Sequence, residues 1–255
     1  MAGRNHGRLA PGATERNSCQ DEIFTMMLCR LEARLSTVPQ AVDDSTVIFS
    51  PYWKSAFRPA VKRGIDLVCA GSLLILLSPL FVALAIAIKA SSPGDLFYRW
   101  RVVGQGGRPL LSYKFRSMVS NADELKGQLE PANEMRGPVF KMTRDPRVTA
   151  AGKWMRRYSL DELPQLYSVL KGEMSLVGPR PPLLSEYQHF TAYQKQKVSV
   201  KPGMTGLWQV QGRNRINDLD DWVRLDLEYI RRWSLWLDTK ILWRTLGVVF
   251  TGSGK

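Results

Sequence analysis

The feature that most constrains this 255-residue chain is residues 67–88, a stretch of twenty-two consecutive residues without a charge. As a straight helix this stretch would extend roughly 33 Å, which is about the thickness of the hydrocarbon core of a bilayer. We therefore expect the chain to insert into a membrane.

The residues around this stretch leave its path through the membrane open. Basic residues flank it on both sides: Lys54, Arg58, Lys62 and Arg63 before it, and Lys89, Arg99, Arg101 and Arg108 after it. Because positive charge favours the cytoplasmic side, both ends are drawn there. Midway through, Ser78 and Pro79 should bend the helix, since proline lacks a backbone donor and clashes with the preceding turn. Two structures follow: a single kinked span, or a re-entrant helix that enters and leaves on the same side.

The composition limits the kinds of partner and chemistry. With 36 basic against 23 acidic residues, the net charge of +13 favours nucleic acid, an anionic membrane surface or phosphorylated substrates. Cys19, Cys29 and Cys69 form no CxxC pair, which indicates a reducing compartment. His6 and His189 are too far apart in sequence to suggest a metal site or histidine catalysis. The first twenty residues contain no apolar core of a secretory signal.

The N-terminal region separates from the rest by its pattern. Residues 1–20 are polar and broken by glycine and proline, so we expect disorder there. Apolar residues at helical spacing predict a short amphipathic helix over residues 21–36, and residues 37–53 are typical of a linker.

After the apolar stretch the pattern predicts a small sheet and two helices. Residues 96–103 and 110–116 are rich in aromatic and β-branched side chains and flank a glycine-rich turn, which predicts a β-hairpin. The glycines lack the spacing of a dinucleotide-binding loop. Residues 121–130 and 149–157 are expected to be helical, with a charged loop at residues 141–147 between them.

Two adjacent carboxylates, Asp161 and Glu162, stand at the expected start of the next helix. Ser159 and Glu162 have the spacing of a capping box, in which Glu162 folds back onto the Ser159 backbone. The same position suits catalysis, because a helix N-terminus together with Arg156 and Arg157 would lower the pKa of Asp161 and hold it ionised. An ionised carboxylate can attack phosphorus, and the nearby N–H groups and arginines would bind phosphate oxygens. These residues alone leave both interpretations open.

Two loops rich in proline and glycine follow. Arg180 stands between prolines, where a rigid guanidinium either binds phosphate in bidentate fashion or is simply solvated. In residues 201–214, backbone donors, Trp208 and Arg213 suit a nucleotide pocket, although a structural turn with a core tryptophan explains them equally well.

The C-terminal part is expected to be helical from Asp218 onward. Tryptophans alternate there with arginines and lysines, which is typical of helices at a membrane interface and also compatible with core packing. The final glycines and Lys255 do not form a phosphate-binding P-loop, because Val249 occupies the place of the first glycine.

Taken together, residues 60–251 resemble the bacterial sugar transferases that are monotopic polyprenol-phosphate phosphoglycosyl transferases and start the synthesis of exopolysaccharide, O-antigen and glycoconjugates. Seven ordered motifs carry the resemblance: Lys62-Arg63-Gly64-Ile65-Asp66, Ser78-Pro79, Lys114-Phe115-Arg116-Ser117-Met118, Asp145-Pro146-Arg147-Val148-Thr149, Ser159-Leu160-Asp161-Glu162-Leu163-Pro164-Gln165-Leu166, Met174-Ser175-Leu176-Val177-Gly178-Pro179-Arg180-Pro181, and Lys201-Pro202-Gly203-Met204-Thr205-Gly206. Residues 1–50 fall outside the resemblance, and the multi-helix membrane domain of larger members is not found here.

The resemblance implies an α+β, mainly α-helical fold, with a re-entrant membrane helix broken at Ser78-Pro79. A catalytic domain on the cytoplasmic face would follow, with a small β-hairpin and interfacial amphipathic helices. The expected parts are an N-terminal extension of residues 1–53, a membrane-inserted segment of residues 54–90 and a catalytic domain of residues 91–255.

The resemblance also implies the reaction: a UDP-sugar and polyprenyl (undecaprenyl) phosphate give polyprenyl-diphospho-sugar and UMP at the bacterial inner membrane. The Asp-Glu pair of the family maps to Asp161 as nucleophile and Glu162 as metal ligand or base. Mg²⁺ would neutralise the diphosphate, held by Asp161 and Glu162. The residues expected to bind substrate are Arg156, Arg180, Lys201 and Arg213.

Two other classes of protein compete with this interpretation. A membrane-tethered nucleic-acid-binding protein would explain the charge, but no recognition helix or aromatic stacking pattern accompanies it. A non-catalytic scaffold would tolerate loss of the carboxylate pair, and both carboxylates are present. We therefore expect an enzyme that acts at a lipid bilayer on a lipid phosphate and not on nucleic acid. The sugar is left open, and a two-fold homodimer is plausible.

Overall fold

The computed structural model describes residues 50, 53, 55, 57–211 and 216–252. By its contacts the chain divides into two units, Met1–Val42 and Asp43–Lys255, and all described residues belong to the second. The disordered segment and the helix expected within residues 1–36 lie outside the described residues.

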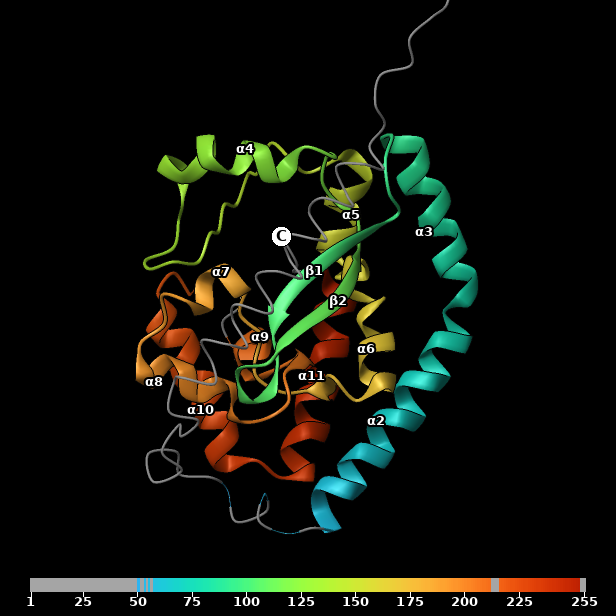
Figure 1. The fold of residues 1–255 in the computed structure, drawn as a ribbon. Coiled ribbons are helices and arrows are strands. Elements are labelled where there is room, and N and C mark those ends of the chain that lie inside the picture. Colours follow the sequence, from blue (N-terminus) through green and yellow to red (C-terminus); the bar gives the residue numbers. More distant parts are fainter. Residues whose placement is uncertain (1–49, 51–52, 54, 56, 212–215, 253–255) are drawn as a thin grey trace, which may run out of the picture. The chain divides into compact units, whose positions relative to one another are not determined.

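The second unit is mainly helical with a small antiparallel sheet, as the sequence predicts (Figure 1). Its α-helices are α2 (Phe57–Leu76), α3 (Ser78–Ser91), α4 (Ala122–Leu129), α5 (Ala150–Arg157), α6 (Gln165–Lys171), α7 (Leu184–Tyr187), α8 (Ala192–Lys195), α9 (Leu207–Gln211), α10 (Leu219–Arg232) and α11 (Leu235–Thr251). Its strands are β1 (Phe97–Val103), β2 (Pro109–Phe115), β3 (Ser175–Val177) and β4 (Gly203–Thr205). Short 3-10 turns are η2 (Gln105–Gly107), η3 (Glu130–Ala132), η4 (Leu160–Glu162) and η5 (Gln196–Ser199).

The expected hairpin is confirmed. Strands β1 and β2 pair antiparallel, with Phe97 opposite Phe115 and Val103 opposite Pro109. The turn between them contains Gly107 at φ 80°, a left-handed conformation that glycine adopts without steric cost. The helices expected over residues 121–130 and 149–157 are confirmed as α4 and α5.

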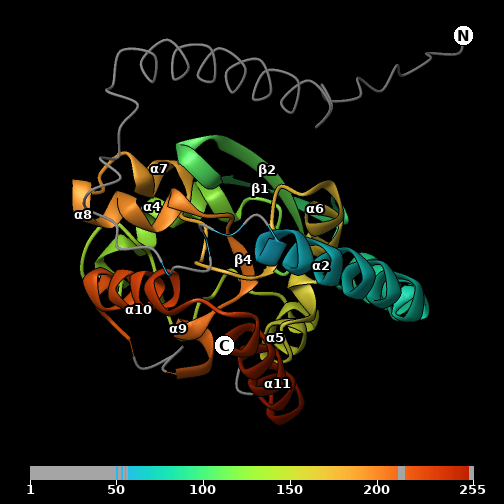
Figure 2. The same ribbon diagram turned by 90° about the horizontal axis from the view of Figure 1, so that it is seen from below.

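A second pair of strands, which the sequence pattern does not indicate, joins the two loops rich in proline and glycine. Strands β3 and β4 run parallel, with Ser175 opposite Gly203 and Val177 opposite Thr205. A side chain at Gly203 would overlap the backbone of Gly178, so the two loops can approach this closely only with glycine there. In the view of Figure 2, β4 lies between the hairpin and helices α9 and α11.

The uncharged stretch forms two helices rather than one. Helix α2 ends at Leu76, α3 begins at Ser78, and the two helices are bent by 60° relative to each other. Pro79 has no N–H to donate to the carbonyl of Ile75, and the Ser78 hydroxyl donates to that carbonyl instead at 2.8 Å. The sequence therefore places the break correctly, and the hydrogen bond gives its physical reason.

Much of the surface of this helix pair is apolar. Its exposed side chains include Val68, Ile75, Leu76, Val82 and Ile86, all five exposed by more than half. Within the described residues, no helix taken alone has the length and apolar character needed to cross a membrane, whereas α2 and α3 meet that requirement together as a bent pair.

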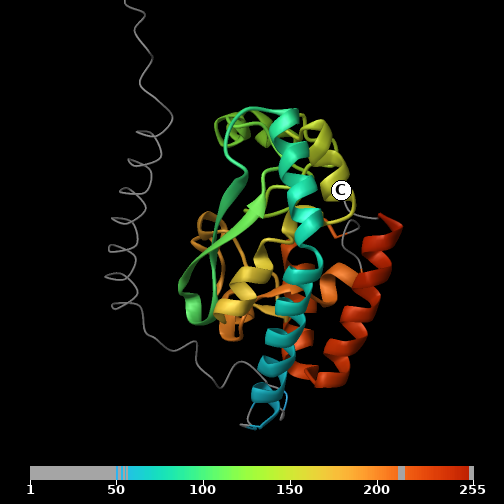
Figure 3. The same cartoon turned by 90° about the vertical axis from the view of Figure 1, so that its right-hand side faces the viewer.

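Helices α2 and α3 run along one side of the unit, with α6 packed on α2 and α5 on α3 (Figures 1 and 3). A small apolar cluster joins Leu84 and Ile88 of α3 to Phe115 of β2 and Met155 of α5. The larger core gathers side chains from α2, the strands, α6 and α9 to α11, among them the fully buried Trp233 and Ile230.

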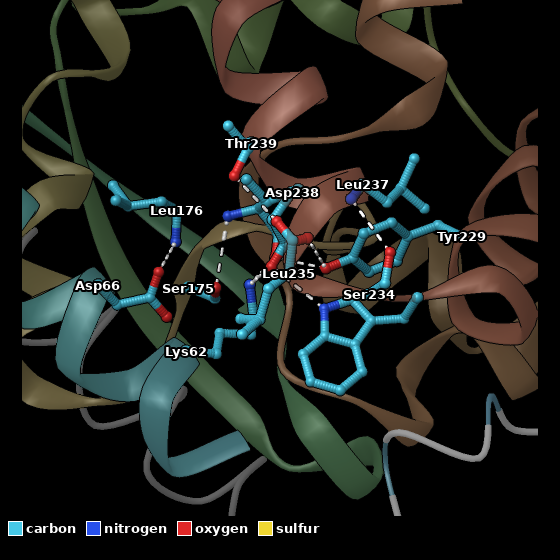
Figure 4. Close-up of polar contacts among 12 residues, drawn as sticks. Lys62, Asp66, Ser175, Leu176, Tyr229, Ser234, Leu235, Leu237, Asp238 and Thr239 are labelled. Carbon is cyan, nitrogen blue, oxygen red and sulfur yellow. Dashed lines mark hydrogen bonds and ion pairs between the residues drawn. The ribbon is translucent and has the colours of Figure 1, made fainter. Parts of the chain in front are cut away.

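Polar contacts also fasten α2 to the rest of the unit (Figure 4). Lys62, on the buried face of α2, forms an ion pair of 2.6 Å with Asp238 of α11 and donates to the carbonyl of Val177. One turn further, Asp66 accepts a hydrogen bond from the backbone N–H of Leu176 at 3.1 Å. The motif Lys62-Arg63-Gly64-Ile65-Asp66 thus binds the helix pair to strand β3 and helix α11.

Arg63 of the same motif reaches the other side of α2. Its guanidinium donates to the carbonyls of Val169 and Leu170 at 2.6 and 2.8 Å, in the last turn of α6. The Val169 carbonyl also accepts from the backbone N–H of Gly172, which ends this helix. A cation near a helix C-terminus is favourable.

Candidate active site

Asp161 and Glu162 lie on the single 3-10 turn η4, between α5 and α6. Ser159, directly before this turn, has a φ of 57°, a left-handed conformation that is strained for serine. Its side chain makes no capping hydrogen bond, so the capping-box interpretation is wrong. The left-handed residue turns the chain away from helical geometry, and α6 begins only at Gln165.

Glu162 is held by a cation from the hairpin. Lys114 of β2 donates to Glu162 Oε1 at 2.7 Å, and both side chains are largely buried. The Lys114 ammonium also lies 3.8 Å from the ring centroid of Trp100 on β1, within the range of a cation–π contact. The hairpin therefore contributes the cation that orients this carboxylate.

The expectation that the pKa of Asp161 is lowered is wrong. Burial of Asp161 and the neighbouring carboxylate of Glu162 raise its pKa, and they outweigh Lys114 and Arg156, which favour the ionised form. The expected helix N-terminus is absent at this position, since α6 starts four residues later. Arg157 is exposed, and its guanidinium lies 5.8 Å from the ring of Tyr158.

A pocket opens beside this turn. It encloses about 200 Å³, including space open to solvent, and its lining combines polar and aromatic side chains: Trp100, Glu162, Gln165, Arg180, Pro181, Gly203, Met204, Trp208 and Gln209. Glu162, on the turn η4 before α6, and Arg180, in the loop after β3, thus face the same space.

Arg180 stands among three tryptophans. Its guanidinium carbon lies 5.9 Å from the ring centroid of Trp100, 5.2 Å from that of Trp208 and 5.7 Å from that of Trp222. Such contacts hold the flat guanidinium without neutralising its charge. Arg180 is thereby presented to the pocket as a cation that can bind phosphate oxygens.

A buried carboxylate supports the loop that carries Arg180. Asp226 of α10 forms an ion pair of 2.6 Å with Lys197 and lies close to the backbone N–H and the guanidinium of Arg180. Burial raises the pKa of Asp226, although Lys197 and Arg180 both favour its ionised form. The negative charge of Asp226 thus balances cations just behind the pocket.

The sequence of the chain was compared with known proteins. The family model described as "Bacterial sugar transferase" matches residues 57–252. The chain belongs to this family. Similar proteins include the galactosyl transferase CpsE of Streptococcus agalactiae, 46% identical over 210 residues, which are 82% of this chain and 46% of CpsE.

Two further relatives differ in the share of their own length that this chain matches. The undecaprenyl-phosphate galactose phosphotransferase of Salmonella typhimurium is 43% identical over 202 residues, 76% of this chain and 41% of that protein. The exopolysaccharide production protein ExoY of Rhizobium meliloti is 36% identical over 218 residues, 83% of this chain and 96% of ExoY. The chain thus spans less than half the length of CpsE and of the Salmonella protein.

In this bacterial sugar transferase, the substrate-binding residues predicted from the sequence do not all meet. Glu162 and Arg180 share the pocket, and Arg156 is close enough to Asp161 to favour its ionised form. The Nε of Arg156 donates to the Ser117 hydroxyl at 2.9 Å, which fixes the side chain from the KFRSM motif.

Of the other two residues predicted to bind substrate, the structure describes Lys201 but not Arg213. Lys201 is exposed and is not part of the pocket lining. Its pKa is lowered by partial burial and by the nearby Arg63 of α2, while Asp66 of α2 opposes the shift. Arg213 lies outside the described residues.

Sequence reasoning missed several residues in and beside the pocket. Lys114 belongs to a motif that supported the family resemblance, but nothing in its spacing shows that it pairs with Glu162, 48 positions away. Gln165 and Gln209 carry no charge and no periodic signal, and only the folded chain brings them to the pocket. Trp208, which the sequence singled out, does line the pocket.

The carboxylates of this sugar transferase suit Mg²⁺ only together with a substrate. Among the described residues, no group of three or more histidine, cysteine, aspartate or glutamate side chains is arranged to hold a metal ion. Mg²⁺ sites that act on phosphates commonly use one or two carboxylates, with phosphate oxygens and water completing the coordination. The adjacent Asp161 and Glu162 meet that requirement.

Proposed function

We propose that this protein transfers a sugar-1-phosphate from a UDP-sugar to polyprenyl phosphate, forming polyprenyl-diphospho-sugar and UMP. The observation that carries the proposal is the pocket in which Glu162, next to the buried Asp161, faces Arg180. Glu162 gives the pocket a carboxylate directly beside Asp161, and Arg180 gives it a cation for phosphate oxygens. The name of the Salmonella relative agrees with this reaction.

In the first step, a carboxylate oxygen of Asp161 attacks the β-phosphorus of the UDP-sugar. The bond from that phosphorus to the bridging oxygen breaks, UMP leaves with the bonding electrons, and the phosphosugar is held on Asp161 as an acyl phosphate. Lys114 and Arg156 favour the ionised form of the nucleophile. Arg180 would stabilise the charge on the diphosphate oxygens.

In the second step, an oxygen of the polyprenyl phosphate attacks the phosphorus of the acyl phosphate. The bond from phosphorus to the Asp161 oxygen breaks, and the carboxylate is regenerated while the lipid diphosphate forms. Glu162, held in place by Lys114, would position the incoming phosphate or accept its proton.

Asp161 and Glu162 would hold Mg²⁺ against the diphosphate oxygens. Bound there, the ion would neutralise phosphate charge as a Lewis acid. Side chains of the protein have the other roles. Lys114 orients Glu162, and the tryptophans around Arg180 shield its guanidinium from water.

We further propose that α2 and α3 form a re-entrant hairpin in the bacterial inner membrane, with the pocket on the cytoplasmic face. The exposed apolar side chains of both helices and the 60° bend support this arrangement. Helix α11 would lie in the same interface, because Trp236, Trp243 and Phe250 are each exposed by more than 60% and Lys240 is exposed beside them.

The reaction is tested by measuring UMP release from UDP-sugars by the detergent-solubilised protein with Mg²⁺ and polyprenyl phosphate. We expect release with one or more donors, and loss of release in Asp161→Asn and in Glu162→Gln. Asp221→Asn is the matched control, because Asp221 is an exposed carboxylate on α10. Variants of the dyad that release UMP at the wild-type rate would refute the proposed function.

The covalent intermediate needs a separate measurement. Without polyprenyl phosphate, the protein should release about one equivalent of UMP and gain the mass of one phosphosugar. This mass should be absent in Asp161→Asn. Release of UMP only when the lipid phosphate is present would contradict a covalent intermediate and favour direct transfer.

A further inference from the structure

Two polar atoms at the pocket have no partner among the described residues. Gln165 is 1% exposed, and no described residue forms a hydrogen bond with its buried Nε2. The buried Oε1 of Gln209 likewise has no partner in the part of the chain that the structure describes. Both residues line the pocket that contains Glu162 and Arg180.

A buried donor and a buried acceptor without partners are unfavourable in a folded protein. Gln165 belongs to α6, which starts just after the carboxylate pair, and Gln209 belongs to α9, so two separate elements bring unpartnered amide atoms to one pocket. A ligand that accepts a hydrogen bond from one amide and donates to the other would satisfy both. Neighbouring hydroxyl groups of a sugar have this chemistry, and so does the imide edge of uracil.

The position of the pocket favours the sugar. Glu162 lines it, so the pocket adjoins the phosphorus at which the proposed reaction takes place. In a UDP-sugar the transferred sugar is bonded directly to the β-phosphate, whereas the uracil is separated from that phosphate by the ribose and the α-phosphate.

We propose that Gln165 and Gln209 recognise hydroxyl groups of the transferred sugar, with Gln165 Nε2 as donor and Gln209 Oε1 as acceptor. Trp100 and Trp208, which also line the pocket, provide apolar faces for the carbon-bound hydrogens of the ring. This inference rests on the proposed function for the identity of the donor, but its test does not require turnover.

Binding is measured in the Asp161→Asn background, so that no donor is consumed. The probes are UDP-galactose, UDP-glucose, UDP-N-acetylgalactosamine and UDP. In this background Gln165→Met and Gln209→Met replace each amide by an apolar side chain of similar length, and Gln211→Met is the matched control. Gln211 is exposed, stands on the same helix as Gln209 and does not line the pocket.

We expect each pocket variant to weaken binding of the tightest UDP-sugar by about 2- to 10-fold, the effect of one neutral hydrogen bond. Binding of UDP should stay unchanged, and Gln211→Met should alter neither affinity. An equal loss of affinity for UDP would place the nucleobase in the pocket and overturn the proposal. Unchanged affinity for every UDP-sugar, or no binding of any probe to the parent protein, would overturn it as well.

Stability separates recognition from a structural role. Because Gln165→Met removes a buried atom without a partner, the melting temperature of the ligand-free protein should stay the same or rise. A lower melting temperature together with an unchanged ratio of UDP-sugar to UDP affinity would show that Gln165 only supports the fold.

Monodeoxy analogues of the tightest donor identify the hydroxyls. When the missing hydroxyl is the one that Gln209 recognises, Gln209→Met should cause no further loss of affinity, because the same contact is already gone. Strictly additive losses for every analogue would overturn the assignment. Failure of the proposed function would appear separately, as absence of UMP release from the protein that retains Asp161.

Discussion

The buried ion pair between Lys62 and Asp238 offers the sharpest test of how α2 is fastened to the catalytic part. Lys62 is 8% and Asp238 is 7% exposed. Asp238 accepts three hydrogen bonds, from Lys62 at 2.6 Å, from the Tyr229 hydroxyl at 2.8 Å and from Trp233 Nε1 at 3.1 Å (Figure 4). The substitution Lys62→Met would remove the only charged donor of the three.

The expected loss of stability follows from the carboxylate that is left behind. Burial already raises the pKa of Asp238, although Lys62, Trp233 and Tyr229 favour its ionised form. Without Lys62 the pKa rises further, until the buried group takes up a proton. Relative to an unfolded aspartate of pKa about 3.9, protonation at pH 7 costs at most about 4 kcal/mol. Part of this cost is already present in the wild type, because burial raises the pKa of Asp238 there too. We therefore expect Lys62→Met to lower the free energy of unfolding by about 2–4 kcal/mol.

The pH dependence of this stability loss tests whether the buried carboxylate causes it. A carboxyl whose pKa is raised in the folded state destabilises that state increasingly as pH rises from the unfolded pKa through the folded one. The stability difference between Lys62→Met and the wild type should therefore shrink as pH falls from 7 to 5. Replacing Asp238 as well, in Lys62→Met with Asp238→Asn, should recover most of the loss, because no buried charge remains.

The assay is urea unfolding in mild detergent, followed by tryptophan fluorescence, since Trp233 lies in the cluster. Lys240→Met on the same helix α11 is the control, because Lys240 is exposed and should change stability by less than about 0.5 kcal/mol. A loss for Lys62→Met as small as that of the control, or a loss that does not change between pH 5 and pH 7, would refute the reasoning.

Three further predictions follow from single contacts. Gly152→Ala should destabilise the protein by about 2 kcal/mol or more, because its Cβ would overlap the backbone carbonyl of Ser117, and an unchanged melting temperature would contradict this. Lys114→Met should lower UMP release about 10- to 100-fold, because it removes the cation that orients Glu162, and wild-type turnover would exclude this role. Pro79→Ala should straighten the helix pair, because position 79 regains its N–H. Cysteine-accessibility labelling in vesicles should then find the two flanks of the pair on opposite sides of the membrane. Unchanged labelling would mean that proline does not set the bend.

Local patterns predicted the elements well where a short-range physical cause dominates. The hairpin of β1 and β2 follows from alternating aromatic residues around a glycine turn, and the break at Ser78 follows from proline chemistry. Prediction failed at Ser159, where the spacing of a capping box was correct but the backbone adopts a left-handed conformation. The expected ionisation of Asp161 was therefore wrong as well. Asp161 lies on a 3-10 turn, and its pKa is raised rather than lowered.

The sequence by itself determined the family, the mainly helical architecture, the bent apolar helix pair and the adjacency of Asp161 and Glu162. Each depends on residues close together in the chain or on ordered motifs, so no distant contact is needed to recognise them. Tertiary structure alone decided which cation orients Glu162 and which side chains complete the pocket with Arg180. It also left Lys201 out of the pocket lining. Such contacts join residues far apart in sequence, and their energies depend on burial, which only the folded chain defines.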